Sequence, residues 1–417
     1  MPLLKKPLKH RQRQLGMALT GAALDGADLA VDVQRDRAPL GGRLERRESH
    51  SEFYILRPMK EHLIAVIPGD GIGREVIPEG IRVLEAVGAR HGIAFKWTEF
   101  PWSCDWYKVH GRMCPQDAPE ILRKFDAVYF GAVGNPALVP DHVAVWGLLI
   151  NFRRWFDLYV NLRPVRLFEG MPCPLAGRKP GDIDYVVIRE NTEGEYGNVG
   201  GRLYEGTERE VVTQLATFSR KGTDRIMKYA FELARKRRKH VTSCTKSNGI
   251  SITMPYWDER FAAMGKNYPD VRTDQYHVDG LTIQMVLNPD RFDVIVASNL
   301  FGDILSDLGP ATAGTIGIAA SGNINPERTA PSIFEPVHGS APDIAGRKIA
   351  NPLATIWSGA LMLEHLGHPQ AAADIVRAIE RVIVEGPHTP DMKGRSGTAE
   401  VGAAVAEAVR AQSKVAA

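Results

Sequence analysis

The sequence lacks an uninterrupted apolar run of the roughly 20 residues that a membrane-spanning helix requires, which argues against an integral membrane protein. Only four of its 417 residues are cysteines, and they form neither a CxxC pair nor another metal-binding spacing. We therefore expect reduced thiols in a cytoplasmic protein rather than a disulfide framework or a zinc site. No segment recurs at a fixed period, which argues against a repeat architecture.

A strong excess of charge of one sign is also missing. The formal net charge is +3, and residues 1–58, with eleven Lys or Arg against seven Asp or Glu, contribute +4 to it. The rest of the chain is therefore nearly neutral, and we expect neither a nucleic-acid nor a membrane partner. Hydrophobic content of 44% and charged content of 24% are typical of a globular protein. A chain of this length favours two domains or lobes.

Residues 1–58 differ from the rest because they lack a sustained hydrophobic period. A signal peptide needs an unbroken apolar segment, but Asp25 and Asp28 interrupt the one that follows the basic start. A transit peptide should contain few acids, which does not fit this segment either. We predict a disordered N-terminal extension, or a start assigned upstream of the true one, before Met59.

From residue 59 onward, strand-like apolar segments alternate with amphipathic helix-like segments. The predicted strands are residues 63–67, 127–134, 183–190, 240–246, 272–278 and 292–298. The predicted helices include residues 74–92, 222–239 and 399–412. This alternation is typical of an α/β protein with a largely parallel sheet that helices cover.

The segment PGDGIG, residues 68–73, lies between a predicted strand and a predicted helix, where a dinucleotide-binding turn could lie. Its spacing is GxGxG rather than GxGxxG, and no acidic residue ends a second strand at the place that a Rossmann fold requires. A tight turn between strand and helix explains the glycines equally well. The segment therefore does not predict a Rossmann fold.

Three aspartates predict a site for a divalent cation. Asp303 and Asp307 are four residues apart in NLFGDILSDLG, so both would project from one face of a helix, and Asp279 follows a strand in YHVDG. Spacing alone would favour solvated acids paired with lysines. The neighbouring positions are apolar, however, and acids beside a buried face need a cation or an arginine. An all-oxygen set favours Mg²⁺ or Mn²⁺ over Zn²⁺.

Arginine, tyrosine and lysine side chains supply further candidates. Arg153, Arg163 and Arg189 could each bind a carboxylate through two hydrogen bonds, because the guanidinium is planar. Arg163 precedes Pro164, and Arg189 follows an apolar strand; the ends of strands in α/β sheets are where ligands bind. Tyr196 follows in ENTEGEYGN, and Lys246 ends a strand, where it is a candidate general base. Ordinary surface positions are the alternative for the lone Arg and Lys residues.

Together these segments resemble the β-decarboxylating dehydrogenase family, which includes isocitrate, isopropylmalate and tartrate/D-malate dehydrogenases. The matching segments occur in the family's order over nearly all of residues 59–417: IPGDGIGREVIPEG, NLRPVR, IRENTEGEYG, VTSCTKSNG, YHVDG, NLFGDILSDLG and EPVHGSAPDIAGRKIANP. The resemblance implies an α/β, isocitrate/isopropylmalate dehydrogenase-like two-domain fold that is not Rossmann-like. Residues 59–158 and 315–417 would form the cofactor-binding domain. Residues 159–314 would form the central domain for substrate, metal and dimerisation.

The resemblance places NAD on the segment HGSAPDIAGRKIAN. The positions that match cofactor-binding residues of the family are His338, Gly339, Ser340, Ala341, Asp343, Ile344 and Asn351. A carboxylate at position 343 could accept hydrogen bonds from both ribose hydroxyls and would repel a 2′-phosphate. Family members that use NADP resemble this segment with a Lys–Tyr pair in place of Asp343–Ile344. NAD is therefore expected, with Mg²⁺ or Mn²⁺ as the metal and K⁺ as an activator.

The resemblance also implies a mechanism. Lys246, directly or through water, would take the proton of the substrate hydroxyl while a hydride passes to the nicotinamide. The three aspartates would hold the metal, which stabilises the alkoxide and then the enolate. The three arginines would bind substrate carboxylates, and Tyr196 would protonate C3 after CO₂ leaves. The family builds this site across a homodimer, so Lys246 and Asp279 would come from the partner subunit.

The substrate is inferred from the residues before Arg153. Isocitrate enzymes have Ser and Asn where this chain has Gly147 and Leu149, so the anchor for a third carboxylate is missing. Isopropylmalate enzymes usually read GLLSLR there, whereas this chain reads WGLLINFR, one residue longer and beginning with Trp146.

The segment AVWGLLINFRRWFDLYVNLRPVRLF is instead similar to tartrate/D-malate dehydrogenases. We expect NAD-dependent oxidation and decarboxylation of a (2R)-hydroxy dicarboxylate, D-malate or tartrate. The alternatives are 3-isopropylmalate, then isocitrate, and, from a different class, a catalytically inactive regulatory subunit. Such a subunit would be expected to lose the metal acids, Lys246 or Tyr196, all of which are present.

Overall fold

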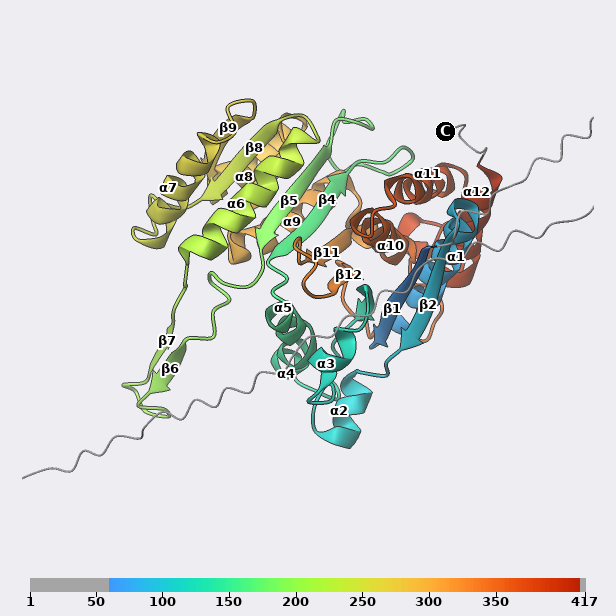
Figure 1. The fold of residues 1–417 in the computed structure, drawn as a ribbon, viewed down its shortest axis with the longest axis horizontal. Coiled ribbons are helices and arrows are strands. Elements are labelled where there is room, and N and C mark those ends of the chain that lie inside the picture. Colours follow the sequence, from blue (N-terminus) through green and yellow to red (C-terminus); the bar gives the residue numbers. More distant parts are fainter. Residues whose placement is uncertain (1–59, 413–417) are drawn as a thin grey trace, which may run out of the picture. The chain divides into compact units, whose positions relative to one another are not determined.

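The computed structural model describes residues 60–412, so the predicted N-terminal extension lies outside the described residues. A ten-stranded sheet runs through this part of the chain (Figure 1). Its strands are β1 (Lys60–Gly69), β2 (Ile93–Glu99), β3 (Ala127–Ala132), β4 (Val160–Arg166), β5 (Asp184–Glu190), β8 (His240–Thr245), β9 (Arg272–His277), β10 (Val294–Ala297), β11 (Ala320–Ile324) and β12 (Ser332–Pro336). Two short strands, β6 (Gly200–Leu203) and β7 (Val211–Gln214), pair with each other in an arm that projects from the rest.

The strand order is β2–β1–β3–β12–β11–β4–β5–β10–β8–β9. Neighbouring strands are parallel except for the pairs β12–β11, β11–β4 and β4–β5 in the middle of the sheet. The prediction of a largely parallel sheet is therefore confirmed. Each of the six predicted strands coincides with an observed strand, and the ends differ by three residues at most.

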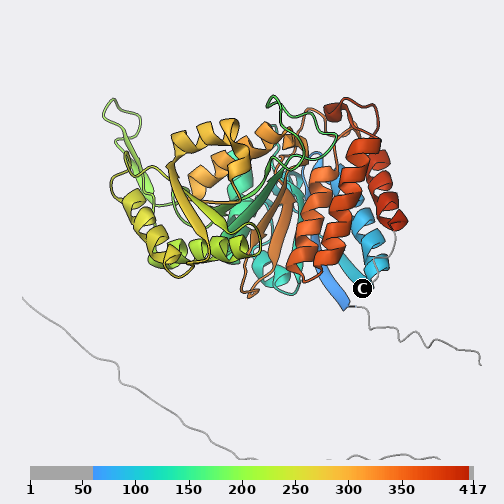
Figure 2. The ribbon, with the colours of Figure 1, turned by 90° about the horizontal axis from the view of Figure 1, so that it is seen from above.

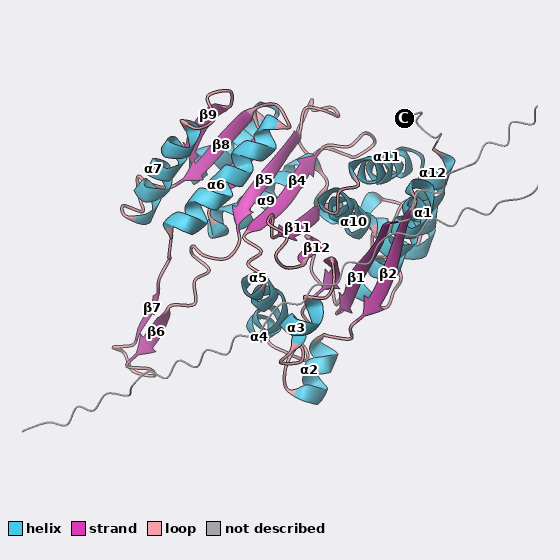
Figure 3. Cartoon of the chain, in the orientation of Figure 1, coloured by secondary structure: helices cyan, strands magenta, loops and turns pink. Residues whose placement is uncertain are grey.

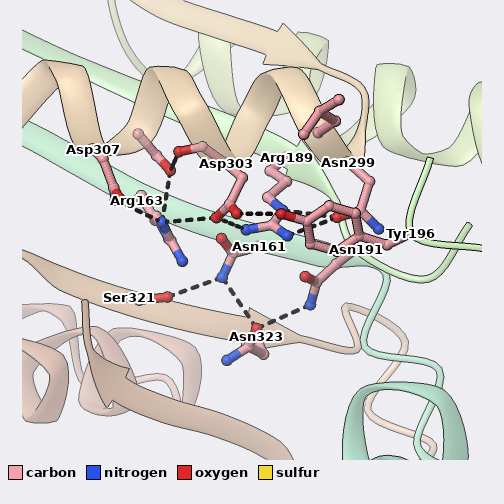
Figure 4. Close-up of polar contacts among 12 residues, drawn as sticks. Asn161, Arg163, Arg189, Asn191, Tyr196, Asn299, Asp303, Asp307, Ser321 and Asn323 are labelled. Carbon is pink, nitrogen blue, oxygen red and sulfur yellow. Dashed lines mark hydrogen bonds and ion pairs between the residues drawn. The ribbon is translucent and has the colours of Figure 1, made fainter. Parts of the chain in front are cut away.

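Four strands of the sheet were not predicted, and two of them, β4 and β11, carry buried polar residues that hid the strand pattern. The Asn161 amide donates hydrogen bonds to Ser321 Oγ (2.9 Å) and Asn323 Oδ1 (3.1 Å), and Asn191 donates to the same Asn323 oxygen at 2.9 Å (Figure 4). All four side chains are buried. A sheet centre with polar side chains is stable here because these groups bind one another.

Helices flank the sheet along its length (Figures 2 and 3). They are α1 (Gly73–His91), α2 (Cys104–His110), α3 (Ala118–Leu122), α4 (Asp141–Val145), α5 (Asn151–Trp155), α6 (Arg220–Arg235), α7 (Thr253–Gly265), α8 (Val278–Leu287), α9 (Asn299–Ala313), α10 (Leu353–His365), α11 (Pro369–Glu385) and α12 (Thr398–Ala411). Four short helical turns complete the set in the part of the chain that the structure describes: η1 (Trp146–Ile150), η2 (Pro289–Arg291), η3 (Ile316–Ile318) and η4 (Pro390–Met392). The predicted helices correspond to α1, α6 and α12. In Figure 2 the blue α1 lies beside the red C-terminal helices, and α1 packs against both α10 and α12.

Apolar side chains fill the spaces between the sheet and the helices. The largest cluster joins strand residues such as Ile188 to helix residues such as Phe231 and Trp357. A second cluster, which includes Phe130 and Phe152, packs on the other face of β1 and β3. Burial of this apolar surface is the main force that holds the helices on the sheet.

The four cysteines are free, as the sequence predicted, and three of them are buried. Burial raises the pKa of the Cys114 thiol to about 11, so this thiol stays protonated and unreactive at neutral pH. None of the helices between residues 60 and 412 is both long and apolar enough to cross a bilayer.

Helix α9 carries Asp303 and Asp307, and its N-terminus is well defined. The Glu195 carboxylate accepts hydrogen bonds from Ser298 Oγ (2.7 Å) and from the backbone N–H of Leu300 (3.0 Å). A negative charge at this end is favourable because the helix dipole is positive there. The helix ends at Gly314, whose φ of +71° suits glycine. The two aspartates are thus held on a helix with fixed ends.

Candidate active site

Two of the three predicted arginines, Arg163 and Arg189, lie beside helix α9 (Figure 4). Arg189, at the end of β5, is 2% exposed, and its Nε and Nη2 donate to Asn299 Oδ1 at 2.9 and 2.8 Å. Its Nη1 pairs with Asp303. Arg163, on β4, donates from Nη1 to Ser306 Oγ at 2.7 Å and to Asp307 Oδ1 at 3.3 Å. The structure therefore brings these arginines and the α9 aspartates together.

Arg153, on α5, lies near the other two arginines. Its Nη2 lies 3.3 Å from Glu335 Oε1, and Glu335 also accepts from the Asn323 amide at 2.7 Å. The Nε atoms of Arg153 and Arg163 are buried and have no hydrogen-bond partner in the described structure. Buried donors normally find an acceptor, so both guanidinium groups retain donors for a bound anion.

Tyr196 completes this group of side chains. Its hydroxyl donates to Asp303 Oδ2 at 2.6 Å, and the Arg189 guanidinium lies 5.1 Å from the centre of its ring. Burial, together with the hydrogen bond to Asp303, raises the pKa of the Tyr196 phenol above its ordinary value. Tyr196 is thus a protonated donor at neutral pH.

The two α9 aspartates have opposite pKa shifts. Burial alone would raise the pKa of Asp303, but the charge of Arg189 and the hydrogen bond from Tyr196 outweigh it and lower the pKa below its ordinary value. Burial raises the pKa of Asp307 above its ordinary value, and neighbouring Asp303 adds to this while Arg163 opposes it. Asp303 is therefore the more strongly ionised of the two carboxylates.

Lys246 and Asp279 form a separate pair, in which Lys246 Nζ donates to Asp279 Oδ1 at 2.8 Å. The Asp279 side chain is 66% exposed, and the hydrogen bond from Lys246 lowers its pKa. Among residues 60–412 of one chain, no three His, Cys, Asp or Glu side chains are grouped so that they could hold a metal ion. One subunit therefore does not assemble the predicted set of three aspartates.

The residues present still fit a hard cation. Asp303 and Asp307 lie one helical turn apart, their side chains are 33% and 62% exposed, and all the donors are carboxylate oxygens. Within this chain Arg163 pairs with Asp307, and Arg189 pairs with Asp303. This agrees with the expectation that acids beside a buried face need a cation or an arginine. An additional carboxylate from outside the chain would complete an oxygen site.

The predicted cofactor segment packs against the glycine-rich turn PGDGIG. The backbone N–H of Ile72 donates to the Ser340 carbonyl at 2.9 Å, and Ser340 Oγ donates to the Gly134 carbonyl. A Cβ atom at Gly71, where φ is +53°, would lie 2.0 Å from the Ser340 carbonyl oxygen. The turn thus needs glycine because another backbone approaches it closely. The motif PGDGIG, which was ambiguous in the sequence alone, therefore forms a tight turn that packs against the predicted cofactor segment.

Several predicted cofactor residues are available to a ligand. Burial lowers the pKa of His338, so its ring is neutral, and its buried Nε2 has no hydrogen-bond partner among the described residues. Space is open around Gly339, because a Cβ atom there would meet nothing within 4 Å. The Asp343 carboxylate is exposed and makes no hydrogen bond or ion pair within residues 60–412. These three positions can contact a bound molecule without breaking existing bonds.

The other predicted cofactor residues hold the segment in place. Ala341 has a left-handed backbone, with φ at +42°, and Ile344 packs on the small apolar cluster beneath the segment. The Asn351 amide donates to Asp391 Oδ2 at 2.9 Å, and its oxygen accepts from the Leu353 backbone at 3.0 Å. Both ends of Asn351 are already engaged, so its side chain anchors the segment.

Sequence reasoning missed several polar residues of the site. Asn299 orients Arg189, and Ser306 orients Arg163. Both lie on α9 with Asp303, three or four residues away, so helical spacing from the predicted metal acids could have identified them. Arg154, which contacts the backbone of Tyr196, had no comparable signal.

Comparison with known proteins places this geometry in a family. A family model described as isocitrate/isopropylmalate dehydrogenase matches residues 63–405. The chain belongs to the isocitrate/isopropylmalate dehydrogenase family. Members of this family in general use NAD and a divalent metal ion. The predicted resemblance, the fold class and the dehydrogenase class are confirmed.

Individual relatives show which members of the family this chain resembles. The chain is 62% identical over 358 residues to the decarboxylating D-malate dehydrogenase of Escherichia coli (strain K12), which covers 84% of this chain and 99% of that protein. It is also 62% identical over 358 residues to a tartrate dehydrogenase/decarboxylase of Pseudomonas putida, with 84% and 98% covered. The crystal structure of isocitrate dehydrogenase from Methylococcus capsulatus superposes with a TM-score of 0.75 at 37% identity, covering 84% of this chain and 99% of that one.

Proposed function

We propose that this enzyme oxidises and decarboxylates a (2R)-hydroxy dicarboxylate, D-malate or tartrate, with NAD as the oxidant. The convergence of Arg153, Arg163 and Arg189 beside Tyr196 carries the proposal, because it combines anion binding with a proton donor. The 62% identity to a D-malate dehydrogenase and to a tartrate dehydrogenase/decarboxylase supports this choice of substrate.

The arginines bind the substrate's carboxylates in this proposal. The unpartnered Nε groups of Arg153 and Arg163 support this role, because each can donate to a carboxylate oxygen without giving up an existing bond. Arg189 already donates from three nitrogens to Asn299 and Asp303, so it orients the site and contributes positive charge.

Lys246 and Tyr196 perform the proton transfers. Lys246 takes the hydroxyl proton as C2 loses its hydride to NAD, which converts the alcohol into a ketone. The bond between C3 and the departing carboxylate then breaks, CO₂ leaves, and its electron pair forms an enolate. The Tyr196 hydroxyl protonates C3 of this enolate, and the raised pKa of the phenol supports that donor role.

The available side chains support NAD and a divalent metal ion as the proposed cofactors. The free Asp343 carboxylate supports NAD over NADP, because it repels a 2′-phosphate and accepts hydrogen bonds from ribose hydroxyls. Asp303 and Asp307, with Asp279 from a second subunit, would hold Mg²⁺ or Mn²⁺. When bound, that ion supplies Lewis-acid stabilisation of negative charge on the substrate oxygen. K⁺ would serve as an activator.

The proposed enzyme is a homodimer in which Lys246 and Asp279 complete the partner's site. The exposed Asp279 carboxylate, which pairs with Lys246, and the lack of a three-ligand group within residues 60–412 of one chain support sharing. Large apolar side chains are exposed on the arm, in the segment before α7 and on α8 and α9: Val199, Leu203, Tyr204, Val211, Val212, Leu215, Ile250, Ile252, Ile283, Val286, Leu287 and Ile304. Such exposure supports an interface with another chain.

In the proposed division of the chain into domains, residues 59–158 and 315–417 bind the cofactor, and residues 159–314 bind the metal and dimerise.

Comparison of kcat/KM for D-malate, L-tartrate, meso-tartrate, 3-isopropylmalate and isocitrate, under identical conditions with NAD and Mn²⁺, tests the proposal. We expect D-malate or a tartrate isomer to be preferred. A clear preference for 3-isopropylmalate or isocitrate would overturn the proposed substrate. Absence of turnover with all five would favour the inactive regulatory subunit.

A further inference from the structure

Arg154 follows the substrate-binding Arg153, and it contacts two elements that surround the site. Its Nη2 donates a hydrogen bond to the backbone carbonyl of Tyr196 at 3.1 Å. Its guanidinium carbon lies 4.6 Å from the centre of the Trp146 ring. It forms no ion pair with a carboxylate among residues 60–412. The Arg154 guanidinium is half-buried and has no acidic partner among these residues. Its hydrogen bond to Tyr196 and its contact with Trp146 are therefore the main restraints on its position.

The geometry of the helix explains how Trp146 and Arg154 meet. Helices α4 and α5 are continuous through η1 (Trp146–Ile150), which is a π-helical turn. In a regular α-helix, residues eight apart would differ by about 80° around the axis. A π-helical turn holds more residues, so each residue advances by a smaller angle. The turn therefore rotates Trp146 towards the face that carries Arg154.

The backbone around Tyr196 is held from two sides. Arg154 binds the Tyr196 carbonyl, while the Gln214 amide, from the arm, donates to the carbonyls of Glu195 (3.2 Å) and Gly197 (3.1 Å). Among residues 60–412, the Tyr196 side chain itself has one hydrogen-bond partner, Asp303. The position of its hydroxyl thus depends on how firmly the backbone is held.

We infer that Arg154 is a positioning residue, which couples the helix carrying Arg153 to Tyr196 and keeps the tyrosine hydroxyl aimed at the reacting carbon. The guanidinium plane can stack on Trp146 and donate to a carbonyl at the same time, which a lysine cannot do equally well. The role in C3 protonation rests on the proposed function, whereas the physical coupling to Tyr196 does not.

A spectroscopic experiment tests the coupling without any substrate. The protein is labelled with 3-fluorotyrosine, and the signal of Tyr196 among the eleven tyrosines is assigned by its loss in Tyr196→Phe. Arg154→Met should shift or broaden this ¹⁹F signal and leave most other tyrosine signals in place, which also reports that the variant is folded. Arg154→Gln is the second variant if Arg154→Met does not fold.

Arg123 offers a matched control on the same side of the molecule. Its Nη2 donates to the carbonyl of Trp155 at 3.2 Å, and its guanidinium lies 5.5 Å from the centre of the Phe156 ring. Arg123→Met removes the same kinds of contact without touching Tyr196, so it should leave the Tyr196 signal unchanged. A Tyr196 signal unaltered in the Arg154 variants, or altered equally in Arg123→Met, would overturn the inference.

A double-mutant cycle then examines the chemical consequence. With oxaloacetate as substrate, Arg154→Met should slow C3 protonation, and it should cause little further loss in a protein that already carries Tyr196→Phe. Losses that multiply in the double variant would contradict positioning through Tyr196. If the unaltered enzyme does not act on D-malate or oxaloacetate, the proposed function fails, and the ¹⁹F result still decides the coupling.

Discussion

The Tyr196 hydroxyl donates a 2.6 Å hydrogen bond to Oδ2 of Asp303, while Arg189 pairs with the other carboxylate oxygen. One side chain of helix α9 therefore connects the expected proton donor to an arginine of the substrate site. This carboxylate balances the charge of Arg189 and accepts a hydrogen bond from Tyr196. In the proposed function it is also a ligand for a divalent cation.

Substitution Asp303→Asn should abolish most turnover. A neutral amide is a poorer ligand for Mg²⁺ or Mn²⁺ and no longer balances Arg189. We expect kcat/KM to fall at least about 100-fold, since loss of even a supporting group around a metal costs 10–100-fold. Circular dichroism should show a folded protein, and excess EDTA should inactivate the unaltered enzyme until Mn²⁺ is restored.

The matched control is Asp290→Asn, which removes a carboxylate that is 57% exposed and pairs with Arg178 rather than with a residue of the candidate site. It should retain nearly full activity. Near-normal activity of Asp303→Asn at limiting Mn²⁺ would show that the metal site lies elsewhere.

Coenzyme choice should depend on Asp343. The double substitution Asp343→Lys with Ile344→Tyr replaces a carboxylate suited to ribose hydroxyls with a cation suited to a 2′-phosphate. We expect kcat/KM for NAD to fall at least about tenfold, because hydrogen bonds to a charged group contribute about 1.5–3 kcal/mol each. Activity with NADP should rise. An unchanged preference for NAD would show that Asp343 does not determine the choice of coenzyme.

The sequence predicted much of the fold because most strands of the sheet carry a continuous apolar pattern. β5, for example, combines the apolar run of residues 185–188 with Arg189 at its end, so both the strand and the site residue were predicted. β4 and β11 were not predicted, because Asn161 and Asn323 bind each other across the sheet centre and interrupt that pattern. Such pairing depends on the strand order, which the local sequence does not contain.

Only some residues of the candidate site were predicted from the sequence, for a similar reason. Asp303 and Asp307 share one helix, and helical spacing alone places them together. The contact of Arg154 with Trp146 depends instead on a π-helical turn between them, and its contact with Tyr196 joins residues 42 positions apart. The separation of Asp279 from Asp303 and Asp307 within residues 60–412 of one chain also has no local sequence signal.

Deletion of residues 1–58 should leave kcat and the melting temperature nearly unchanged. The composition of this segment gives it too little regular apolar surface to offset the entropy cost of ordering. The shortened protein would be compared with the full chain by size-exclusion chromatography, thermal unfolding and kcat. Loss of the soluble, active dimer would contradict the prediction.

Glu190 should make the protein less stable as the pH rises from about 5 to 8. Burial raises the pKa of this carboxyl from 4.5 to about 7, although hydrogen bonds from Glu193 and Thr192 oppose the rise. The folded state thus binds the proton more tightly than the unfolded chain. The resulting stabilisation is complete below pH 4.5 and is lost as the pH rises through about 7.

The maximum change is roughly 3 kcal/mol in the free energy of unfolding. It would be measured by urea unfolding at fixed protein concentration, because the proposed dimer would make the measured stability depend on that concentration. Glu190→Gln should flatten the pH dependence between pH 5 and 8, whereas the exposed control Glu208→Gln should not. Equal slopes in the unaltered protein and Glu190→Gln would contradict the assignment.

Substitutions of Lys246 and Tyr196 should separate oxidation from the steps that follow it. Lys246→Met removes the group that takes the hydroxyl proton, so hydride transfer itself should slow. Tyr196→Phe removes only the proton donor for C3, so the steps after oxidation should be chiefly affected. General acid–base groups typically contribute about 10²–10⁴-fold, so either loss is easily measured.

Oxaloacetate, the keto acid expected from D-malate, distinguishes the two variants because its metal-dependent decarboxylation needs no redox step. In this assay Lys246→Met should keep a larger fraction of its activity than in the full reaction. Tyr196→Phe should incorporate deuterium at C3 more slowly or with less stereoselectivity, because its hydroxyl no longer delivers the proton. If both variants were equally impaired in oxidation and unimpaired with oxaloacetate, the division of roles between Lys246 and Tyr196 would be wrong, while membership of the family would stand.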